Sequence, residues 1–217
     1  TRKQFGDVTL NGYYLYDDEG VKARPVTVVD KGILKTFLMS RSPIQGFANS
    51  NGHGRKSPGN EIVSRQSNLF VESTKQVSDA ELRRLLIEEV KRQNKPYGLF
   101  FDQVTSGYTT TGRRGLQAFT VVPLVVYRVY ADGRPDELVR GVDIVGTPLA
   151  SFAKITATSN RPEVFNGICG AESGNVPVAT IAPALLVSEI EVQRKDSSRD
   201  RPPYLSPPPA ESRELRP

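Results

Sequence analysis

Short runs of β-branched and aromatic residues, separated by turn residues, occur along most of the chain and predict β-strands. The predicted strands are Pro25–Val29, Ile33–Met39, Tyr97–Phe101, Gln117–Tyr130, Leu138–Val145, Val178–Ile181 and Leu185–Val192. Between the first two, Asp30-Lys31-Gly32 predicts a hairpin whose glycine adopts the left-handed conformation. Asp132-Gly133 predicts a second turn, which leads into the strand at 138–145. We therefore expect a protein dominated by strands.

Two segments have the pattern of helices instead. Ser78 and Glu81 have the spacing of a capping box, which marks the start of a helix. Apolar residues then follow at helical spacing, at Leu82, Leu85, Leu86 and Val90. A shorter helix is predicted to begin at Thr147, with Pro148 in its first turn. Its expected buried residues are Leu149, Phe152 and Ala153. Strands flanked by two or so helices predict an α+β fold with a predominantly antiparallel sheet.

The composition changes near residue 192, which we take as the end of the folded region. Residues 193–217 contain Pro202-Pro203 and Pro207-Pro208-Pro209 among serine and charged residues, and they have almost nothing to bury. Such a segment is expected to be disordered, with a polyproline-like middle. The alternatives are docking to an aromatic groove, or packing of Tyr204-Leu205 on a partner subunit. The predicted organisation is a folded domain at 1–192 and a Pro-rich, charged tail at 193–217.

A second polar stretch, residues 40–66, is rich in Ser, Asn, Gly and Pro and has little periodicity. A loop of this length inside a compact domain is usually functional or disordered. Its run from Gly52 to Ser57 resembles a phosphate-binding loop, but the required Gly-x-x-x-x-Gly-Lys-Ser spacing is absent because Arg55 separates Gly54 from Lys56. We therefore do not expect nucleotide binding.

The net charge of +5, from 29 basic and 24 acidic residues, is confined to these two polar segments. Residues 193–217 contain six basic and four acidic side chains, and residues 40–66 contain four basic side chains and one acidic. The remainder is neutral, whereas a nucleic-acid-binding surface normally places basic and aromatic residues together on the folded body. The charge pattern therefore favours solvated segments over direct contact with nucleic acid.

The chain has one cysteine, Cys169, and one histidine, His53. A single cysteine excludes an internal disulfide, and a single histidine excludes any motif that needs two, so this chain cannot complete a typical zinc site alone. The sequence contains no transmembrane-length apolar run and no signal-peptide pattern at its start. Because the chain begins at Thr1 and its only methionine is Met39, we expect a processed product or fragment, cytoplasmic unless a signal peptide lies upstream.

Cys169 is the most reactive group that the sequence offers. It lies between glycines in Asn166-Gly167-Ile168-Cys169-Gly170, which we interpret as a turn-rich segment whose backbone can direct a thiolate toward a partner. The residues alone leave open an inert buried cysteine, or a metal ligand or nucleophile. A cysteine-protease pair with His53 lacks any local signature.

A set of short motifs occurs in a fixed order between about Phe5 and Val192. The motifs are Asp17-Asp18-Glu19-Gly20-Val21, Val28-Val29-Asp30-Lys31-Gly32-Ile33-Leu34, Asn51-Gly52-His53-Gly54-Arg55, Ser67-Asn68, Tyr130-Ala131-Asp132-Gly133, Val139-Arg140-Gly141-Val142, Gly167-Ile168-Cys169-Gly170 and Val176-Pro177-Val178. This ordered set resembles the C-terminal half of TldD/PmbA family metallopeptidases, and it covers nearly all of the predicted folded region.

The resemblance implies zinc-dependent hydrolysis of peptides. In the family, a helix upstream of this region carries His-Glu-x-x-x-His, which supplies two zinc ligands and the catalytic Glu, and a cysteine of the C-terminal half supplies the third ligand. That cysteine corresponds to Cys169. Arg55, His53 and Asn68 are implied as substrate-binding residues, with an exposed loop position as the alternative for Arg55. No catalytic residue is expected on this chain, which we predict to be inactive alone.

The resemblance also implies a homodimer or heterodimer, with a partner chain or segment that carries the His-Glu-x-x-x-His motif. Unfolded peptides or small proteins would bind in extended form along a sheet edge, for which residues 105–111 are our prediction. The spacing from Cys169 to Val176 favours the catalytic type of subunit. The alternative is a non-catalytic subunit that binds peptides or stabilises its partner. A nucleic-acid-linked modulator, suggested by an older family name, is disfavoured by the charge pattern.

Overall fold

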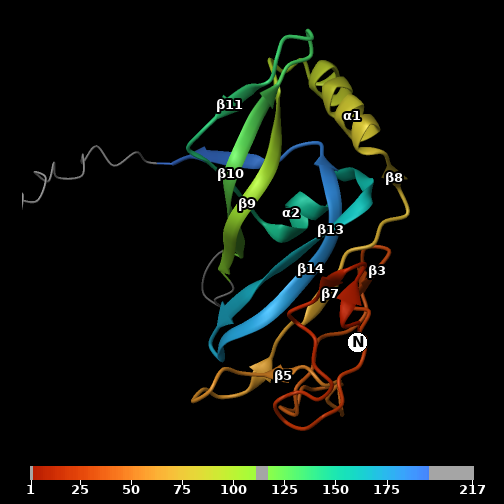
Figure 1. The fold of residues 1–217 in the computed structure, drawn as a ribbon, viewed down its shortest axis with the longest axis vertical. Coiled ribbons are helices and arrows are strands. Elements are labelled where there is room, and N and C mark those ends of the chain that lie inside the picture. The colour runs from red at the N-terminus through yellow and green to blue at the C-terminus, as the bar shows by residue number, and fades with distance from the viewer. Residues whose placement is uncertain (1, 111–116, 196–217) are drawn as a thin grey trace, which may run out of the picture. The chain divides into compact units, whose positions relative to one another are not determined.

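The computed structural model describes residues 2–110 and 117–195, and the chain divides into two compact units. Of the described residues, the first unit contains 2–89 and 155–188, and the second contains 90–110, 117–154 and 189–195. Each unit has its own sheet, drawn as a ribbon in Figure 1. The division falls near the end of the long helix, which sequence patterns do not mark as a boundary.

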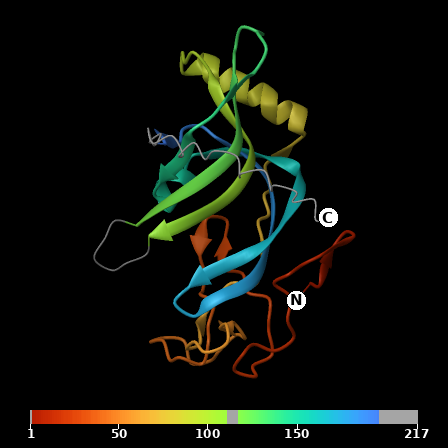
Figure 2. The ribbon, with the colours of Figure 1, turned by 60° about the vertical axis from the view of Figure 1, so that its left-hand side comes forward.

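The first unit is centred on a long antiparallel hairpin of β13 (Ile155–Ala171) and β14 (Gly174–Val187). Two short strands complete its sheet by pairing in parallel, β7 (Asn68–Phe70) with β14 and β8 (Gln76–Val77) with β13. The curvature of this hairpin is clear in Figure 2. Only its second strand was predicted in part, at 178–181 and 185–192, whereas β13 was not predicted as a strand.

Three small antiparallel hairpins lie in the same unit. They are β1 (Gln4–Phe5) with β2 (Val8–Thr9), β3 (Val29–Asp30) with β4 (Ile33–Leu34), and β5 (Gly54–Arg55) with β6 (Val63–Ser64). The predicted hairpin at residues 25–39 is confirmed at β3–β4, with shorter strands than expected. Lys31 and Gly32 form its turn with φ of 50° and 78°, so both central residues are left-handed, as a tight two-residue hairpin requires.

The core of the first unit lies on one face of the β13–β14 hairpin. Leu10, Ala179 and Ile181 are almost fully buried and form one apolar cluster. Phe5, Phe70 and Val164 pack against it. The N-terminal segment is therefore held to the sheet by apolar burial, to which each large side chain contributes about 1.5–3 kcal/mol.

The first predicted helix is confirmed as α1 (Asp79–Arg92). Its start has the predicted cap, because the Glu81 backbone N–H donates to Ser78 Oγ at 3.2 Å. Val90 is buried, and the other predicted apolar positions, Leu82, Leu85 and Leu86, are half-buried. The capping signal and the helical spacing thus fixed this element locally.

The second unit contains a five-stranded antiparallel sheet. Its strands are β9 (Gly98–Thr110), β10 (Ala118–Val129), β11 (Glu137–Val139), β12 (Val142–Gly146) and β15 (Glu191–Arg194). β10 pairs with β9 along one edge and with β11 and β12 along the other, and β15 pairs with β12. Within the described part of the chain, β9 pairs on one side only, which makes it an edge strand.

The second predicted helix is also present, but its predicted burial is wrong. α2 (Pro148–Phe152) begins after Thr147 with Pro148 in its first turn. Leu149 is 84% exposed and Phe152 is 66% exposed. A helix this short is closed by its own backbone bonds, from Ala153 N to Leu149 O and from Lys154 N to Ser151 O, both 3.1 Å. It therefore forms without burying an apolar face.

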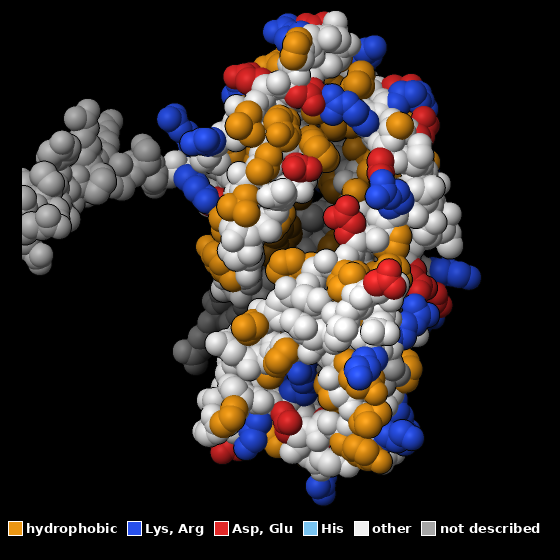
Figure 3. All heavy atoms as spheres, viewed as in Figure 1, with side chains coloured by type: hydrophobic (Ala, Val, Ile, Leu, Met, Phe, Trp, Pro, Cys, Tyr) orange, Lys and Arg blue, Asp and Glu red, His pale blue; other side chains and the backbone are white. Residues whose placement is uncertain are grey.

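The architecture confirms the α+β class with a mostly antiparallel sheet and two helices. The last strand ends at Arg194, two residues beyond the predicted boundary at 192. The rest of the predicted tail, from residue 196, lies outside the described residues. Among the helices of the described segments, none is long and apolar enough to cross a membrane. On the face seen in Figure 3, basic side chains are interspersed with acidic ones.

Candidate functional site

Cys169 lies near the end of β13 and is half-buried. It pairs with Val176 of β14, and the hairpin turn follows between Ala171 and Gly174. The prediction of a turn-rich segment at 166–170 is therefore wrong. A Cβ at Gly167 would lie 2.6 Å from Cε1 of Phe165, but Phe165 is exposed and its ring can move aside.

The polar stretch at 40–66 is an ordered part of this site, because it binds the turn of the β13–β14 hairpin. The Ser57 N–H donates to the Ser173 carbonyl at 2.9 Å, and the Asn175 N–H donates to Ser57 Oγ at 3.0 Å. Gly174 has φ of 84°, and a Cβ there would lie only 1.8 Å from Ser57 Oγ. Figures 1 and 2 both show the β5 region beside the turn end of the hairpin.

Arg65 connects this stretch to the cysteine. Its Nη2 donates to the Cys169 carbonyl at 2.5 Å, and its Nη1 donates to Ser173 Oγ at 2.6 Å and to the Gly174 carbonyl at 2.9 Å. Arg65 is 5% exposed and Ser173 is fully buried. No local pattern in the sequence distinguishes Arg65 from other polar loop residues, and sequence reasoning did not identify it.

Arg55 is buried rather than exposed, so the exposed-loop alternative for this residue is wrong. Its Nη1 donates to the carbonyls of Gln66, at 2.7 Å, and Pro177, at 2.8 Å. The guanidinium lies 4.8 Å above the centre of the Tyr14 ring, a cation–π contact. Burial lowers the pKa of Arg55, and burial raises the pKa of Tyr14 to about 12 despite the nearby cation. A role in binding substrate stays a prediction.

His53 is also buried, and its ring lies edge-on to Tyr14. Its Nδ1 is 2.9 Å from Oδ1 and 3.2 Å from the carbonyl oxygen of Asn51. Both partners are acceptors, so Nδ1 carries the proton and Nε2 keeps the lone pair of the neutral ring. Burial lowers the pKa of His53. The imidazole is therefore neutral at pH 7, and its role in binding substrate stays a prediction.

The glycines on either side of His53 allow the 17–23 segment to approach. A Cβ on Gly52 would lie 2.5 Å from the Lys22 carbonyl oxygen, and one on Gly54 would lie 2.5 Å from Oε2 of Glu19. The buried Asp17 carboxylate accepts from the Gly54 N–H at 3.0 Å. Two motifs that are far apart in sequence therefore form one packed unit, in which Asp17 has a structural role that the sequence alone did not reveal.

Asn68 belongs to a different part of the first unit. It lies on β7, and its Nδ2 donates to the Arg2 carbonyl at 2.9 Å. Its Oδ1 is buried without a hydrogen-bond partner in the described part of the chain, and it faces Gly12. These contacts attach the N-terminal segment to the sheet. A contact of Asn68 with substrate stays a prediction.

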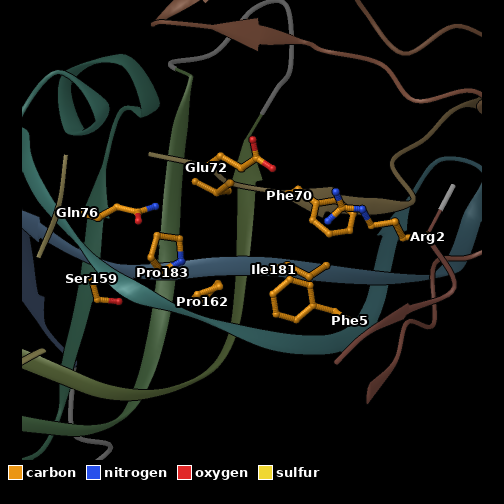
Figure 4. Close-up of a pocket in the computed structure, with 10 residues that line it drawn as sticks. Arg2, Phe5, Phe70, Glu72, Gln76, Ser159, Pro162, Ile181 and Pro183 are labelled. Carbon is orange, nitrogen blue, oxygen red and sulfur yellow. The ribbon is translucent and has the colours of Figure 1, made fainter. Parts of the chain in front are cut away.

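A small cavity of about 110 Å³ lies on the sheet of the first unit, as seen in Figure 4. Apolar side chains that include Phe5, Phe70 and Ile181 form much of its wall, and Arg2 and Glu72 also line it. Its volume is below the range of about 300–1,000 Å³ that is usual for ligand pockets. None of the predicted site residues lines it, so the cavity does not change the candidate site.

The donor set for a metal is incomplete in the residues described. They contain no group of three or more His, Cys, Asp and Glu side chains that could hold a metal ion. The half-buried Cys169 thiol is a donor type that suits zinc.

The sequence of this chain matches that of a known protein family. The sequence profile described as the PmbA/TldA metallopeptidase C-terminal domain matches residues 7–194. The chain belongs to the TldD/PmbA family. The prediction from the ordered motifs is thereby confirmed.

Individual relatives agree with this assignment. The chain is 30% identical over 176 residues to metalloprotease MJ0996 of Methanocaldococcus jannaschii, covering 79% of this chain and 36% of that protein. It is 26% identical over 180 residues to a metalloprotease of Methanothermobacter thermautotrophicus, covering 82% of this chain and 37% of that protein. The chain thus spans little more than a third of these relatives.

A solved structure supports the fold. TldE from Thermococcus kodakarensis superposes with a TM-score of 0.57 at 16% identity, covering 82% of this chain and 36% of that one. At this identity the match supports the shared architecture.

Proposed function

We propose that this chain supplies the cysteine ligand of a zinc-dependent peptidase of the TldD/PmbA type, with Cys169 as the ligand. The two remaining protein ligands and the catalytic Glu would come from a His-Glu-x-x-x-His helix on an upstream segment or on a partner chain. The observation that carries the proposal is the match of the metallopeptidase domain over residues 7–194, within which Cys169 is the only thiol. That thiol is half-buried, and its residue is paired with Val176 of β14.

A zinc ion with three protein ligands keeps a fourth position for water, lowers the pKa of that water and polarises a peptide carbonyl. This chain would contribute a thiolate on the β13–β14 hairpin. The single cysteine must stay reduced to serve as a ligand, which favours the cytoplasm as the location.

We also propose that an unfolded peptide or small protein binds in extended form along β9, within a homodimer or heterodimer. β9 offers unpaired backbone groups along one side within the described residues, and strand addition at such an edge gives affinity with little sequence preference. The predicted contact region, 105–111, includes Thr111, which lies outside the described residues. Arg55, His53 and Asn68 are retained as proposed substrate-binding residues.

Replacement of Cys169 tests the proposal. In the assembled protein, Cys169→Ser should abolish peptide cleavage and reduce zinc content to background, because serine is a poor zinc ligand. Zinc content and activity that survive the replacement would instead support the non-catalytic binding or stabilising subunit. Intact-mass measurement of the same sample identifies any partner chain. The isolated chain with added zinc should not cleave an unstructured peptide, and cleavage that a chelator stops would contradict this.

A further inference from the structure

We propose that Arg65 is a positioning residue for Cys169, which fixes the direction of the thiol toward the metal. This inference rests on the proposed function, because it assumes that Cys169 is a metal ligand. Arg65 does not itself touch the metal in this proposal. Contacts between the 40–66 stretch and the turn of the β13–β14 hairpin support it.

The guanidinium of Arg65 holds three acceptors of the hairpin end at once. It bonds the carbonyl of Cys169, the Ser173 hydroxyl and the Gly174 carbonyl, at 2.5, 2.6 and 2.9 Å. The Cys169 carbonyl belongs to the peptide plane directly after the ligand residue. Fixing that plane restricts the backbone torsion ψ of Cys169 and hence the direction in which its Cα–Cβ bond points.

The hairpin needs such a restraint because its sequence is flexible at this point. Glycines occupy positions 167 and 170, on either side of Cys169, and glycine loses more conformational freedom on folding than any other residue. A metal ligand must be held within about 0.5 Å of its productive position. The three hydrogen bonds of the buried Arg65 guanidinium restrict the backbone at this point, which the glycines do not.

Arg65 is itself well anchored. It follows β6 directly, and its backbone N–H donates to the His53 carbonyl at 2.9 Å. Its side chain is 5% exposed. Burying a cation is costly unless its donors are satisfied, and here the satisfying groups belong to the segment that carries the cysteine. Arg65 and the end of the hairpin therefore hold each other in position.

Arg55 provides a matched control. It is also buried and also donates to a hairpin carbonyl, that of Pro177 at 2.8 Å, but its bonds do not include the carbonyl of Cys169. Lysine at either position keeps the charge but replaces a planar fork of donors with a single flexible ammonium. Arg55 interacts with Cys169 through its charge, which lysine keeps. Arg65→Lys and Arg55→Lys therefore disturb the same region, and only the first removes a hydrogen bond to the ligand residue.

The test measures metal binding in the assembled protein rather than activity. Cobalt(II) is used in place of zinc, because a thiolate ligand gives a charge-transfer absorption band, and affinity is obtained by competition with a chelator. We expect Arg65→Lys to weaken cobalt binding at least about tenfold, the lower end for outer-shell partners of metal ligands, and to shift the band. Arg55→Lys should change the affinity less than about threefold.

Three outcomes separate this inference from the proposed function. Wild-type affinity and band in Arg65→Lys would overturn the positioning role, as would equal losses in both lysine variants, which would indicate general packing. A Cys169→Ala variant that keeps the band would overturn the proposed function itself. If circular dichroism shows Arg65→Lys to be unfolded, Arg65→Gln is measured in its place. Glutamine leaves no unpaired cation in the buried position, and the same criteria apply.

Discussion

Replacing Gly52 by alanine should destabilise the first unit strongly. Gly52 has φ of 80°, and an added Cβ would lie 2.5 Å from the carbonyl oxygen of Lys22 and 2.7 Å from Cα of Ala23. Both atoms belong to the backbone, so no side chain can rotate away to relieve the overlap. Gly46 is the matched control, because it has φ of 85° and an added Cβ there meets nothing within 4 Å.

Both replacements place alanine in the left-handed region, and only Gly52→Ala also creates an overlap with backbone atoms. A non-glycine residue in the left-handed region costs about 1–2 kcal/mol, and alanine recovers about 0.4–1 kcal/mol by restricting the unfolded chain. Gly46→Ala should therefore lose about 0–1.6 kcal/mol. Gly52→Ala adds the backbone shift needed to relieve the overlap, about 1–3 kcal/mol by analogy with overpacked cores. The expected difference between the variants is about 2 kcal/mol.

Urea denaturation followed by far-UV circular dichroism measures this difference. With a slope of about 1–3 kcal/mol per molar urea, the midpoint of Gly52→Ala should lie on the order of 1 M below that of Gly46→Ala. Both positions belong to the first unit, so the same transition is compared. Equal midpoints would refute the argument that Gly52 is required by the approach of the 17–23 segment.

Two further predictions concern the buried histidine and the apolar core. In an NMR titration, the single histidine, His53, should have a pKa below its usual value of about 6.5, because burial disfavours the charged ring. The unfolded state then binds more protons, so stability is lost as the pH falls below about 6.5 toward the folded pKa, and a pKa at or above 6.5 would contradict this. Leu10→Ala removes a side chain that is 1% exposed and should cost about 2–5 kcal/mol. Leu149→Ala, at 84% exposed, should change stability by less than about 0.5 kcal/mol, and similar losses in the two variants would refute the assigned core.

Local sequence signals predicted the elements whose formation depends on neighbouring residues. The cap at Ser78 and Glu81 and the helical spacing after it predicted α1, and the left-handed Gly32 predicted the β3–β4 hairpin. Each signal acts within a few residues, through a hydrogen bond or a torsion angle. β13 was missed around Cys169 because its glycines favour turns locally, while pairing along β14 makes a strand there.

The sequence by itself determined the α+β class, the helix positions, the family and the identity of the one thiol that a metal could use. Only the tertiary structure decided which polar residues are buried in the unit that carries that thiol. Arg55, His53 and Arg65 look alike on the chain as polar loop residues, and all three are buried. Their partners lie up to 122 positions away in sequence, as in the bond from Arg55 to the Pro177 carbonyl. Burial of a charged side chain depends on whether distant carbonyls satisfy its donors, and that is set by how the chain packs rather than by its local sequence.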